Sequence, residues 1–266
     1  MSLIINILIF LIIFYTVTVK SRKSLHMLQQ NLYNENNRYL KWLKQNRKVA
    51  LKHYDVIGLI LSLIALFIGN LPGKVLIAIS ALIYLFDAEV IKYSIMVEKA
   101  KKPLVKTARV KRQITALYLL NLIPLILYLI FKSNVRILFV LASLMLVLNY
   151  YVVYLVKLIN DPIEKAIYKK FWRMAENKLA SYKDLKVIGI TGSYGKTSSK
   201  NILNEILSMD YISHPTPKNF NTDVGLMTTI NNDLTKFDEI FIAEMGAYKV
   251  GRIKNACNLG MEMPNS

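Results

Sequence analysis

Five apolar runs occupy the first 156 residues of the chain, with polar segments between them. The runs cover residues 3–19, 56–69, 75–86, 116–131 and 137–156. A bilayer core of roughly 30 Å needs about 20 apolar residues in a helix, and shorter runs can span it when flanking Lys and Arg side chains snorkel. The pattern therefore predicts a helical membrane half with about five spans over residues 1–156.

The connections between these runs are of two kinds. Pro72-Gly73 separates the second and third runs, and residues 132–136 separate the fourth and fifth. Pro-Gly is typical of a turn, so each pair is expected to form a helical hairpin. The first run has no basic segment before it and no small-residue cleavage site after it, which indicates a signal anchor.

Residues 157–185 place apolar and basic positions at helical spacing. Asp161-Pro162, followed by Glu164, is typical of the start of a helix. A basic amphipathic helix next to a membrane can lie on anionic headgroups, and it can also pack on the domain that follows. The sequence leaves both alternatives open.

Short β-branched segments then alternate with helical ones from residue 186 to the last residue, 266. Strands are expected near residues 187–190, 211–213 and 239–244, and helices near residues 197–207 and 223–231. The repeating strand–helix order predicts a parallel, doubly wound sheet that binds ligands at the carboxyl ends of its strands. Residues 186–266 are thus expected to form a partial α/β P-loop domain.

The charge distribution agrees with a membrane half. The net charge is +18, and residues 1–156 carry 20 Lys and Arg against 5 Asp and Glu, whereas residues 157–266 carry 15 against 12. The basic excess therefore belongs to the segments that flank the apolar runs, so nucleic-acid binding is not expected.

The same charges predict the topology. The long loops at residues 20–55 and 87–115 hold 17 Lys and Arg, and the two short loops hold three. The positive-inside rule places the long loops in the cytoplasm. The sequence therefore predicts a multi-pass protein that has its N-terminus outside and everything after Val156 in the cytoplasm.

The stretch from Lys186 to Lys200 predicts a phosphate-binding loop. A β-branched strand leads into a turn with two glycines and then directly into a helix, so backbone N–H groups and the helix dipole can converge on phosphate oxygens. Lys196 is expected to reach the β- and γ-phosphates of ATP, and Thr197 to bind Mg²⁺. The candidate nucleotide ligands are Thr191, Gly192, Ser193, Tyr194, Gly195, Lys196, Thr197 and Ser198.

The spacing of this loop is compressed. Ile190 stands where a general P-loop has its first glycine, so only G-x-x-G-K-T is present. The alternative is a glycine turn whose lysine is merely exposed.

The sequence also offers a candidate metal ligand. Glu244 ends the apolar strand at residues 239–244, where a Mg²⁺ ligand is needed beside a P-loop. Its alternative is a surface acid at the end of a strand.

Three motifs in order resemble the central ATPase domain of the Mur ligase family, in particular the type that adds D-alanyl-D-alanine to the UDP-muramoyl-tripeptide of peptidoglycan. They are T-G-S-Y-G-K-T-S-S-K, T-P-K-N-F-N-T-D-V-G-L and A-E-M-G-A-Y-K-V-G-R-I, within about Val187–Leu259. The resemblance implies that ATP and Mg²⁺ are cofactors and that Thr197 and Glu244 bind the metal. It also implies catalytic roles for the residues Lys196, Asn219 and Asn221, the two asparagines lying near the γ-phosphate and the acyl substrate.

The implied reaction activates a peptide carboxylate as an acyl phosphate, which an amine then attacks to form an amide. Two departures from the family pattern bear on this expectation. Membrane spans take the place of the UDP-binding domain, and the chain stops at Ser266. That end lies before the family's later lysine–histidine site, base contacts and amine-binding domain. We therefore expect a fragment that is inactive alone.

Three functions remain open at this point. The first is a membrane-anchored amide ligase of peptidoglycan precursor synthesis in a bacterial membrane. Its partners would be ATP, a nucleotide- or lipid-linked precursor peptide and membrane lipids. The second is a related ligase of the poly-γ-glutamate type, and the third is a non-catalytic nucleotide-binding membrane protein. The T-P-K-N-F-N stretch favours the first, and the end at Ser266 favours the third.

Overall fold

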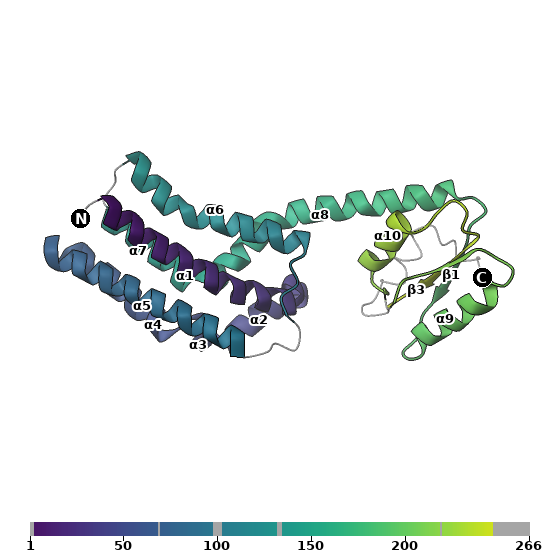
Figure 1. Cartoon of the computed structure of the whole chain (residues 1–266), viewed down its shortest axis with the longest axis horizontal. Helices are drawn as coiled ribbons and strands as arrows, with labels where there is room; N and C mark the ends of the chain where they lie inside the picture. Colours follow the sequence, from purple (N-terminus) through teal and green to yellow (C-terminus); the bar gives the residue numbers. More distant parts are fainter. Residues whose placement is uncertain (1–2, 69, 98–102, 132–134, 219, 247–266) are drawn as a thin grey trace. The chain divides into compact units, whose positions relative to one another are not determined.

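A computed structural model of the chain describes residues 3–68, 70–97, 103–131, 135–218 and 220–246 (Figure 1). The chain divides into two compact units, Met1–Pro162 and Ile163–Ser266. Helices build the first, here called the helical unit. The second contains a parallel three-stranded sheet and is called the sheet unit.

Helices account for nearly all of the described part of the helical unit. They are α1 (Leu3–Gln30), the 3-10 segment η1 (Leu32–Asn37), α2 (Arg38–Gln45), α3 (Arg47–Ala50), α4 (His53–Phe67), α5 (Asn70–Val97), α6 (Ala108–Phe131), α7 (Val135–Val147) and the first part of α8 (Asn149–Ser181). Among the described residues, α1 and α6 are long and apolar enough to cross a membrane, and α7 with α8 gives a third candidate if the bent pair is one span. Two to three apolar helices are thus observed where the sequence predicted about five spans.

The helices do not end where the apolar runs end. α1 continues past Val19 to Gln30, and α5 continues past Phe86 to Val97. Polar residues form the same backbone hydrogen bonds as apolar ones, so a polar flank need not be a loop. The expected turn residues Pro72 and Gly73 lie in the first turn of α5, where a proline has no N–H that would need a helical partner.

The last two helices of this unit correct another expectation. The sequence predicted one span over residues 137–156 and a new helix at Asp161-Pro162. Instead the chain bends by 83° between α7 and α8, and α8 runs on through Pro162. The bend adjoins Asn149, whose amide bonds α1: Ser24 Oγ donates to Asn149 Oδ1 at 2.7 Å, and Asn149 Nδ2 donates to Ser21 Oγ at 3.0 Å.

Asp161 also has a role different from the predicted helix cap. Its carboxylate accepts a hydrogen bond from Lys157, one turn earlier on α8, and lies 3.5 Å from Arg109 Nη2 of α6. The carboxylate is therefore engaged by two cations, and the helix continues past it.

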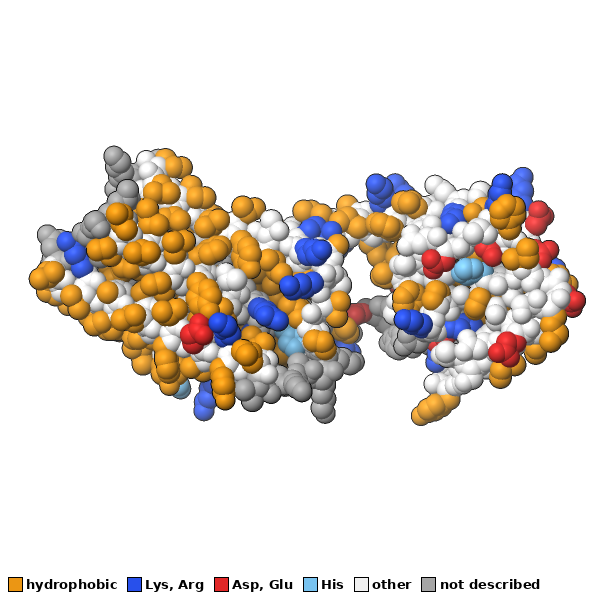
Figure 2. Space-filling model, in the orientation of Figure 1, with side chains coloured by type: hydrophobic (Ala, Val, Ile, Leu, Met, Phe, Trp, Pro, Cys, Tyr) orange, Lys and Arg blue, Asp and Glu red, His pale blue; other side chains and the backbone are white. Residues whose placement is uncertain are grey.

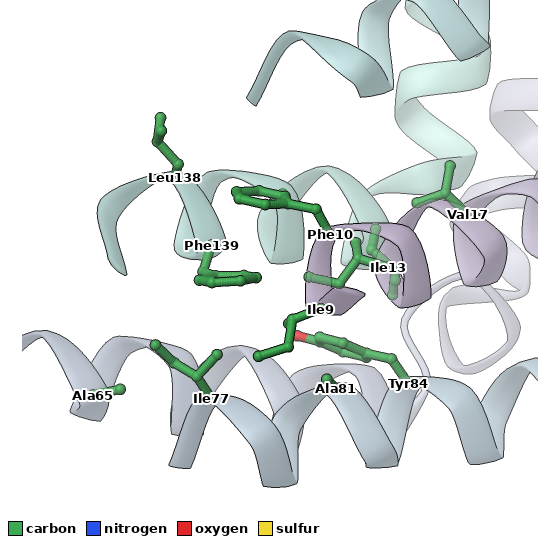
Figure 3. Close-up of a cluster of buried hydrophobic side chains, with 12 residues drawn as sticks. Ile9, Phe10, Ile13, Val17, Ala65, Ile77, Ala81, Tyr84, Leu138 and Phe139 are labelled. Atoms are coloured by element: carbon green, nitrogen blue, oxygen red, sulfur yellow. The ribbon is translucent and has the colours of Figure 1, made fainter. Parts of the chain in front are cut away.

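One hydrophobic core of the helical unit lies between α1, α4, α5 and α7 (Figure 3), and a second lies between α1, α2, α6 and α8. The rings of Phe10 and Phe139 stack with their centroids 4.5 Å apart, and Tyr84 is completely buried beside them. Hydrophobic side chains also cover much of the face of this unit that Figure 2 shows. Leu82 and Leu119, for example, are each 62% exposed. So much exposed apolar surface is expected of a unit that lies in lipid.

Charged residues that flank the apolar runs pair inside the unit. Lys20 of α1 donates to Asp55 of α4, and both are buried. Lys52 Nζ lies 2.7 Å from Oδ1 of Asp87, a buried residue of α5. These pairs connect α1, α4 and α5 at positions that the sequence assigned to the edges of polar loops.

The sheet consists of β1 (Lys186–Ile190), β2 (Ser213–Pro215) and β3 (Ile240–Glu244) in the order β1-β3-β2, all parallel. β3 is buried along its whole length, because it is the central strand and both faces of the sheet are covered. Figure 1 shows α9 (Lys196–Leu207) and α10 (Asp223–Asn232) on opposite sides of the sheet. The strand–helix order and the parallel pairing are as predicted. The described sheet has three strands, so a complete doubly wound sheet stays a prediction.

The last part of α8 belongs to the sheet unit. Ala175 and Leu179 are buried against Ile230 of α10 and Phe241 of β3. The expectation that this helix packs on the following domain is therefore correct for that face. Phe171 and Met174 are each 46% exposed on another part of the helix, which leaves the membrane-surface alternative open.

Candidate nucleotide and metal site

The glycine turn between β1 and α9 has the backbone that the motif requires. Gly195 precedes the first residue of α9 with φ +75°, and Gly192 has φ +153°. Both values lie in a region that L-residues with a Cβ rarely adopt, so glycine is needed for the conformation. The turn delivers the chain directly to the N-terminus of α9, whose first N–H groups have no helical partner and can bind an anion.

The side chains of this turn differ in their placement. Lys196 Nζ donates to Gly192 O at 2.5 Å, so the ammonium curls back over the turn. Tyr194 is 96% exposed. The small polar residues of the turn and first helical turn, Thr191, Ser193 and Ser198, are also exposed. The structure thus leaves this side of the turn open to a ligand, with Lys196 at its centre.

Thr197 and Glu244 meet across the ends of two strands. The Thr197 Oγ1 hydroxyl donates to Glu244 Oε2 at 3.0 Å. Glu244 pairs in register with Ile190, the last residue of β1, and Met245 N donates to Ile190 O at 2.8 Å. Adjacent parallel strands therefore bring the helix start and the acid to the same edge of the sheet.

This pair of oxygens fits a magnesium ion. Two adjacent ligands of an octahedral Mg²⁺ with bonds of about 2.1 Å are about 3 Å apart. The distance of 3.0 Å between Thr197 Oγ1 and Glu244 Oε2 matches that edge. The described residues contain no group of three or more His, Cys, Asp and Glu that could hold a metal. The two side chains would therefore share the ion with phosphate oxygens and water, as Mg²⁺ sites for nucleotides do.

The asparagine-rich segment, residues 216–222, approaches the same carboxylate. Asn221 Nδ2 donates to Glu244 Oε1 at 3.2 Å, and Gly246 N donates to Asn221 O at 2.8 Å. Thr216 is held at the end of β3, because Glu244 N donates to its Oγ1 at 3.0 Å. Asn219 lies outside the described residues, as does the third motif beyond Gly246.

Lys200 belongs to the site although the sequence did not single it out. It is 1% exposed, and its ammonium donates to Thr216 O at 2.7 Å and to Lys218 O. It also lies 3.4 Å from Glu244 Oε2. Lys200 follows Thr197 by three positions and so shares its helix face, but this spacing alone does not predict that Lys200 is buried.

The charges of the site suit a polyanion. Lys196 and Lys200 oppose the single carboxylate of Glu244, and the N-terminus of α9 adds partial positive charge.

A cavity of about 350 Å³ lies elsewhere in the sheet unit, at the amino ends of β1 and β3 near Lys186 and Ile240. Ligands of parallel sheets bind at the carboxyl ends. We therefore assign the site to the turn and Glu244, and not to this cavity.

Comparison with known proteins identifies this region. Residues 190–262 match the Mur ligase middle domain. Over 68 residues the chain is 40% identical to the UDP-N-acetylmuramoyl-tripeptide--D-alanyl-D-alanine ligase of Bacillus subtilis (strain 168), which is 26% of this chain and 15% of that protein. No solved structure matches the chain significantly.

The predicted resemblance to the Mur ligase family is thereby confirmed for residues 190–262, here called the Mur ligase segment. This segment contains the whole site, from Lys196 and Thr197 through Lys200 and Asn221 to Glu244. The chain spans about 15% of the length of the relative that it matches.

Proposed function

We propose that this protein is a membrane-anchored, ATP-dependent amide ligase of peptidoglycan precursor synthesis. The observation that carries the proposal is the contact between Thr197 and Glu244 at 3.0 Å, next to Lys196, within the Mur ligase segment. It supports a site for Mg·ATP, because a hydroxyl, a carboxylate and an ammonium are the groups that hold a metal-bound triphosphate.

In the proposed mechanism the backbone N–H groups at the start of α9 and the Lys196 ammonium hold the phosphates of ATP. Thr197 and Glu244 would hold Mg²⁺, which when bound neutralises charge on the transferring phosphoryl group. Asn221, whose amide donates to Glu244 Oε1, would orient the acyl substrate. Asn219 would share this role.

The proposed reaction has two steps. A carboxylate oxygen of the precursor peptide attacks the γ-phosphorus of ATP, which releases ADP and forms an acyl phosphate. The amine of the second substrate then attacks the acyl carbon, phosphate leaves, and the amine loses a proton as the amide forms. The side chains of this site position the reactants and stabilise charge, which is what most phosphoryl transfer requires of a protein.

The proposed location is a bacterial membrane with the Mur ligase segment in the cytoplasm. Support comes from the candidate spans α1 and α6, the exposed apolar side chains of the helical unit and the basic loops. We propose that α4, α5 and the bent pair α7–α8 complete a topology of about five spans, with the N-terminus outside. The anchor would cover residues 1–156, the juxtamembrane helix 157–185 and the ATP-binding domain 186–266.

The acyl substrate proposed is a peptidoglycan precursor peptide attached to a nucleotide or to a lipid. The matched Bacillus subtilis protein is named for a UDP-N-acetylmuramoyl-tripeptide and D-alanyl-D-alanine, which makes these the first substrates to test.

The decisive experiment measures binding of a fluorescent ATP analogue to the full chain in detergent, with and without Mg²⁺. We expect Lys196→Ala to weaken binding at least tenfold, because it removes the ammonium at the centre of the turn. Lys183→Ala removes an exposed lysine of the same unit and should leave binding unchanged. Equal binding by the wild type and Lys196→Ala would refute the site.

A second measurement separates ligation from binding alone. Phosphate release should require the UDP-linked tripeptide and D-alanyl-D-alanine together if the chain, alone or with further ligase domains supplied, is a ligase. Mg²⁺-dependent ATP binding without turnover under both conditions would favour the non-catalytic alternative.

A further inference from the structure

A cavity of about 140 Å³ lies in the helical unit between α1, α6 and the segment that precedes α6. Its polar lining includes Arg22 of α1, Lys106 of the connecting segment and Tyr118 of α6. Leu25, Leu104 and Ile114 supply apolar walls. No acidic residue is among the described residues that line the cavity, so its charge is positive.

Three of the polar groups that line this cavity have no partner among the residues that the structure describes, whereas Thr18 donates to Phe14 O and Ser21 accepts from Asn149. The guanidinium of Arg22, the ammonium of Lys106 and the hydroxyl of Tyr118 form no hydrogen bond or ion pair there. The ring of Tyr118 packs on Phe14 with the centroids 5.6 Å apart, so the ring is held while its hydroxyl stays available. Three hydrogen-bond donors of this kind suit the oxygens of a phosphate.

The segment that carries Lys106 is fixed to α1. Gln29 Nε2 donates to Val105 O at 2.9 Å, and Val105 N donates to Gln29 Oε1 at 2.9 Å. This pair of bonds holds the backbone next to Lys106 as a neighbouring strand would. The backbone beside Lys106 is therefore held against α1, the helix that carries Arg22, and both of these cationic side chains are exposed.

The cavity also lies at the level where lipid headgroups are expected. On α1 the apolar run ends at Val19, shortly before Arg22, and on α6 the apolar run begins at Ala116, shortly before Tyr118. These two helices are the candidate spans. The lining thus straddles the boundary between apolar and polar residues on both helices, and Figure 2 shows Lys and Arg side chains gathered near one end of this unit.

We propose that this cavity binds the phosphate of an anionic membrane lipid. The cations neutralise the headgroup, and the acyl chains lie along exposed apolar residues of the same helices, such as Leu11 and Leu119. The inference rests on the membrane placement proposed above, although it does not require catalysis.

The test measures lipid binding to the full chain, purified in a neutral detergent, by native mass spectrometry and by thermal shift. Phosphatidylglycerol is the probe, and phosphatidylcholine, which carries a phosphate but no net charge, is the reference. We expect saturable binding of phosphatidylglycerol and at least a tenfold loss of its affinity in the double variant Arg22→Gln/Lys106→Gln. Lys41→Gln/Lys48→Gln makes the same change of charge at exposed positions of the same unit and should bind normally.

A variant that fails to fold would be recognised by its melting temperature without lipid. Tyr118→Phe, which removes one hydroxyl, should still show a several-fold loss of affinity for phosphatidylglycerol.

Equal affinity for the two lipids, or equal losses in the two double variants, would overturn the proposal. Displacement of phosphatidylglycerol by millimolar inorganic phosphate would also overturn it, because the site would then serve a soluble anion. If alkaline carbonate releases the chain from membranes, the membrane placement itself fails, whereas a chain that stays in the membrane without lipid preference refutes only the cavity.

Discussion

The ammonium of Lys200 lies 3.4 Å from Oε2 of Glu244, and both residues are about 1% exposed. The same ammonium donates to Thr216 O and Lys218 O. One buried cation therefore joins α9, the asparagine-rich segment and the end of β3. A buried carboxylate is costly unless it is paired and hydrogen-bonded, so Lys200 allows Glu244 to stay at the contact with Thr197.

Replacing Lys200 by Met should destabilise the sheet unit by about 3–5 kcal/mol, because removing one partner leaves the other charge buried and unpaired. Two backbone carbonyls lose their donor as well. In a Trp42→Phe background the remaining tryptophan, Trp172, packs against the core of the sheet unit and reports its unfolding. Thermal melting of the full chain, followed by this fluorescence, measures the effect.

The matched control is Lys183→Met, which makes the same substitution at an exposed lysine of this unit. Its melting temperature should equal that of the parent. A further variant, Lys200→Met/Glu244→Gln, should lose less stability than the sum of its single changes, because each single change leaves the partner's charge unpaired and the double change leaves no charge behind. Strict additivity would show that the ion pair between Lys200 and Glu244 does not stabilise the contact between α9 and β3.

The Thr197 hydroxyl should set the Mg²⁺ requirement of nucleotide binding. Thr197→Val keeps the shape of the side chain but removes the oxygen that lies 3.0 Å from Glu244 Oε2. We expect the Mg²⁺ concentration for half-maximal binding of the ATP analogue to rise about tenfold or more, as for other losses around a metal. Thr197→Ser restores a hydroxyl and should recover most of the affinity. The prediction fails if Val and Ser behave alike.

Glycine should be required at position 195 because of the backbone conformation there, and not because a larger side chain would clash. An added Cβ would meet nothing within 4 Å, but φ is +75°. Gly195→Ala should therefore cost about 1 kcal/mol, and Gly195→Val more, because a β-branched residue fits this region poorly. Gly195→Asn should be the mildest change, since asparagine tolerates it best. Melting of the sheet unit gives the order, and an Asn variant no better than Ala would contradict the conformational explanation.

The sequence could predict that most residues of the candidate nucleotide site lie together, because the relevant signals are local. The strand, the glycine turn and the helix start are contiguous in the chain, and an acid at the end of a neighbouring parallel strand must lie at the same edge of the sheet. Contiguity and strand direction are thus enough to bring Thr197 and Glu244 together. Lys200 could not be found in the same way, because its burial depends on the carbonyls of Thr216 and Lys218, which a helix pattern does not reveal.

The helical unit shows how little the sequence says about the ends and contacts of helices. Apolar runs located α1 and α6, but they could not locate the ends of helices, because polar residues continue a helix as readily as apolar ones. Asp161 was predicted to cap a helix. Instead it contacts Lys157 along its own helix α8 and Arg109 on the neighbouring helix α6. Lys20 and Asp55 likewise resemble loop charges until the packing of α1 against α4 is known.

The buried pair of Lys20 and Asp55 provides the last prediction. Lys20→Met should destabilise the helical unit by about 3–5 kcal/mol, because it leaves the Asp55 carboxylate buried without its cation, and Asp55 Oδ1 has no hydrogen-bond partner among the described residues. Trp42, which lies in this unit, reports the transition when Trp172 is replaced by Phe. Lys41→Met, an exposed change in the same unit, is the control.

The double variant Lys20→Met/Asp55→Leu distinguishes stability from specificity at this pair. Apolar side chains of similar size can replace a buried ion pair at little or no cost, so this variant should regain most of the stability lost by either single change. If it does, the pair does not stabilise the unit more than apolar packing would. Its contribution would then be to fix one arrangement of α1 against α4, which hydrogen exchange of the α4 amides in the double variant would detect as faster local opening.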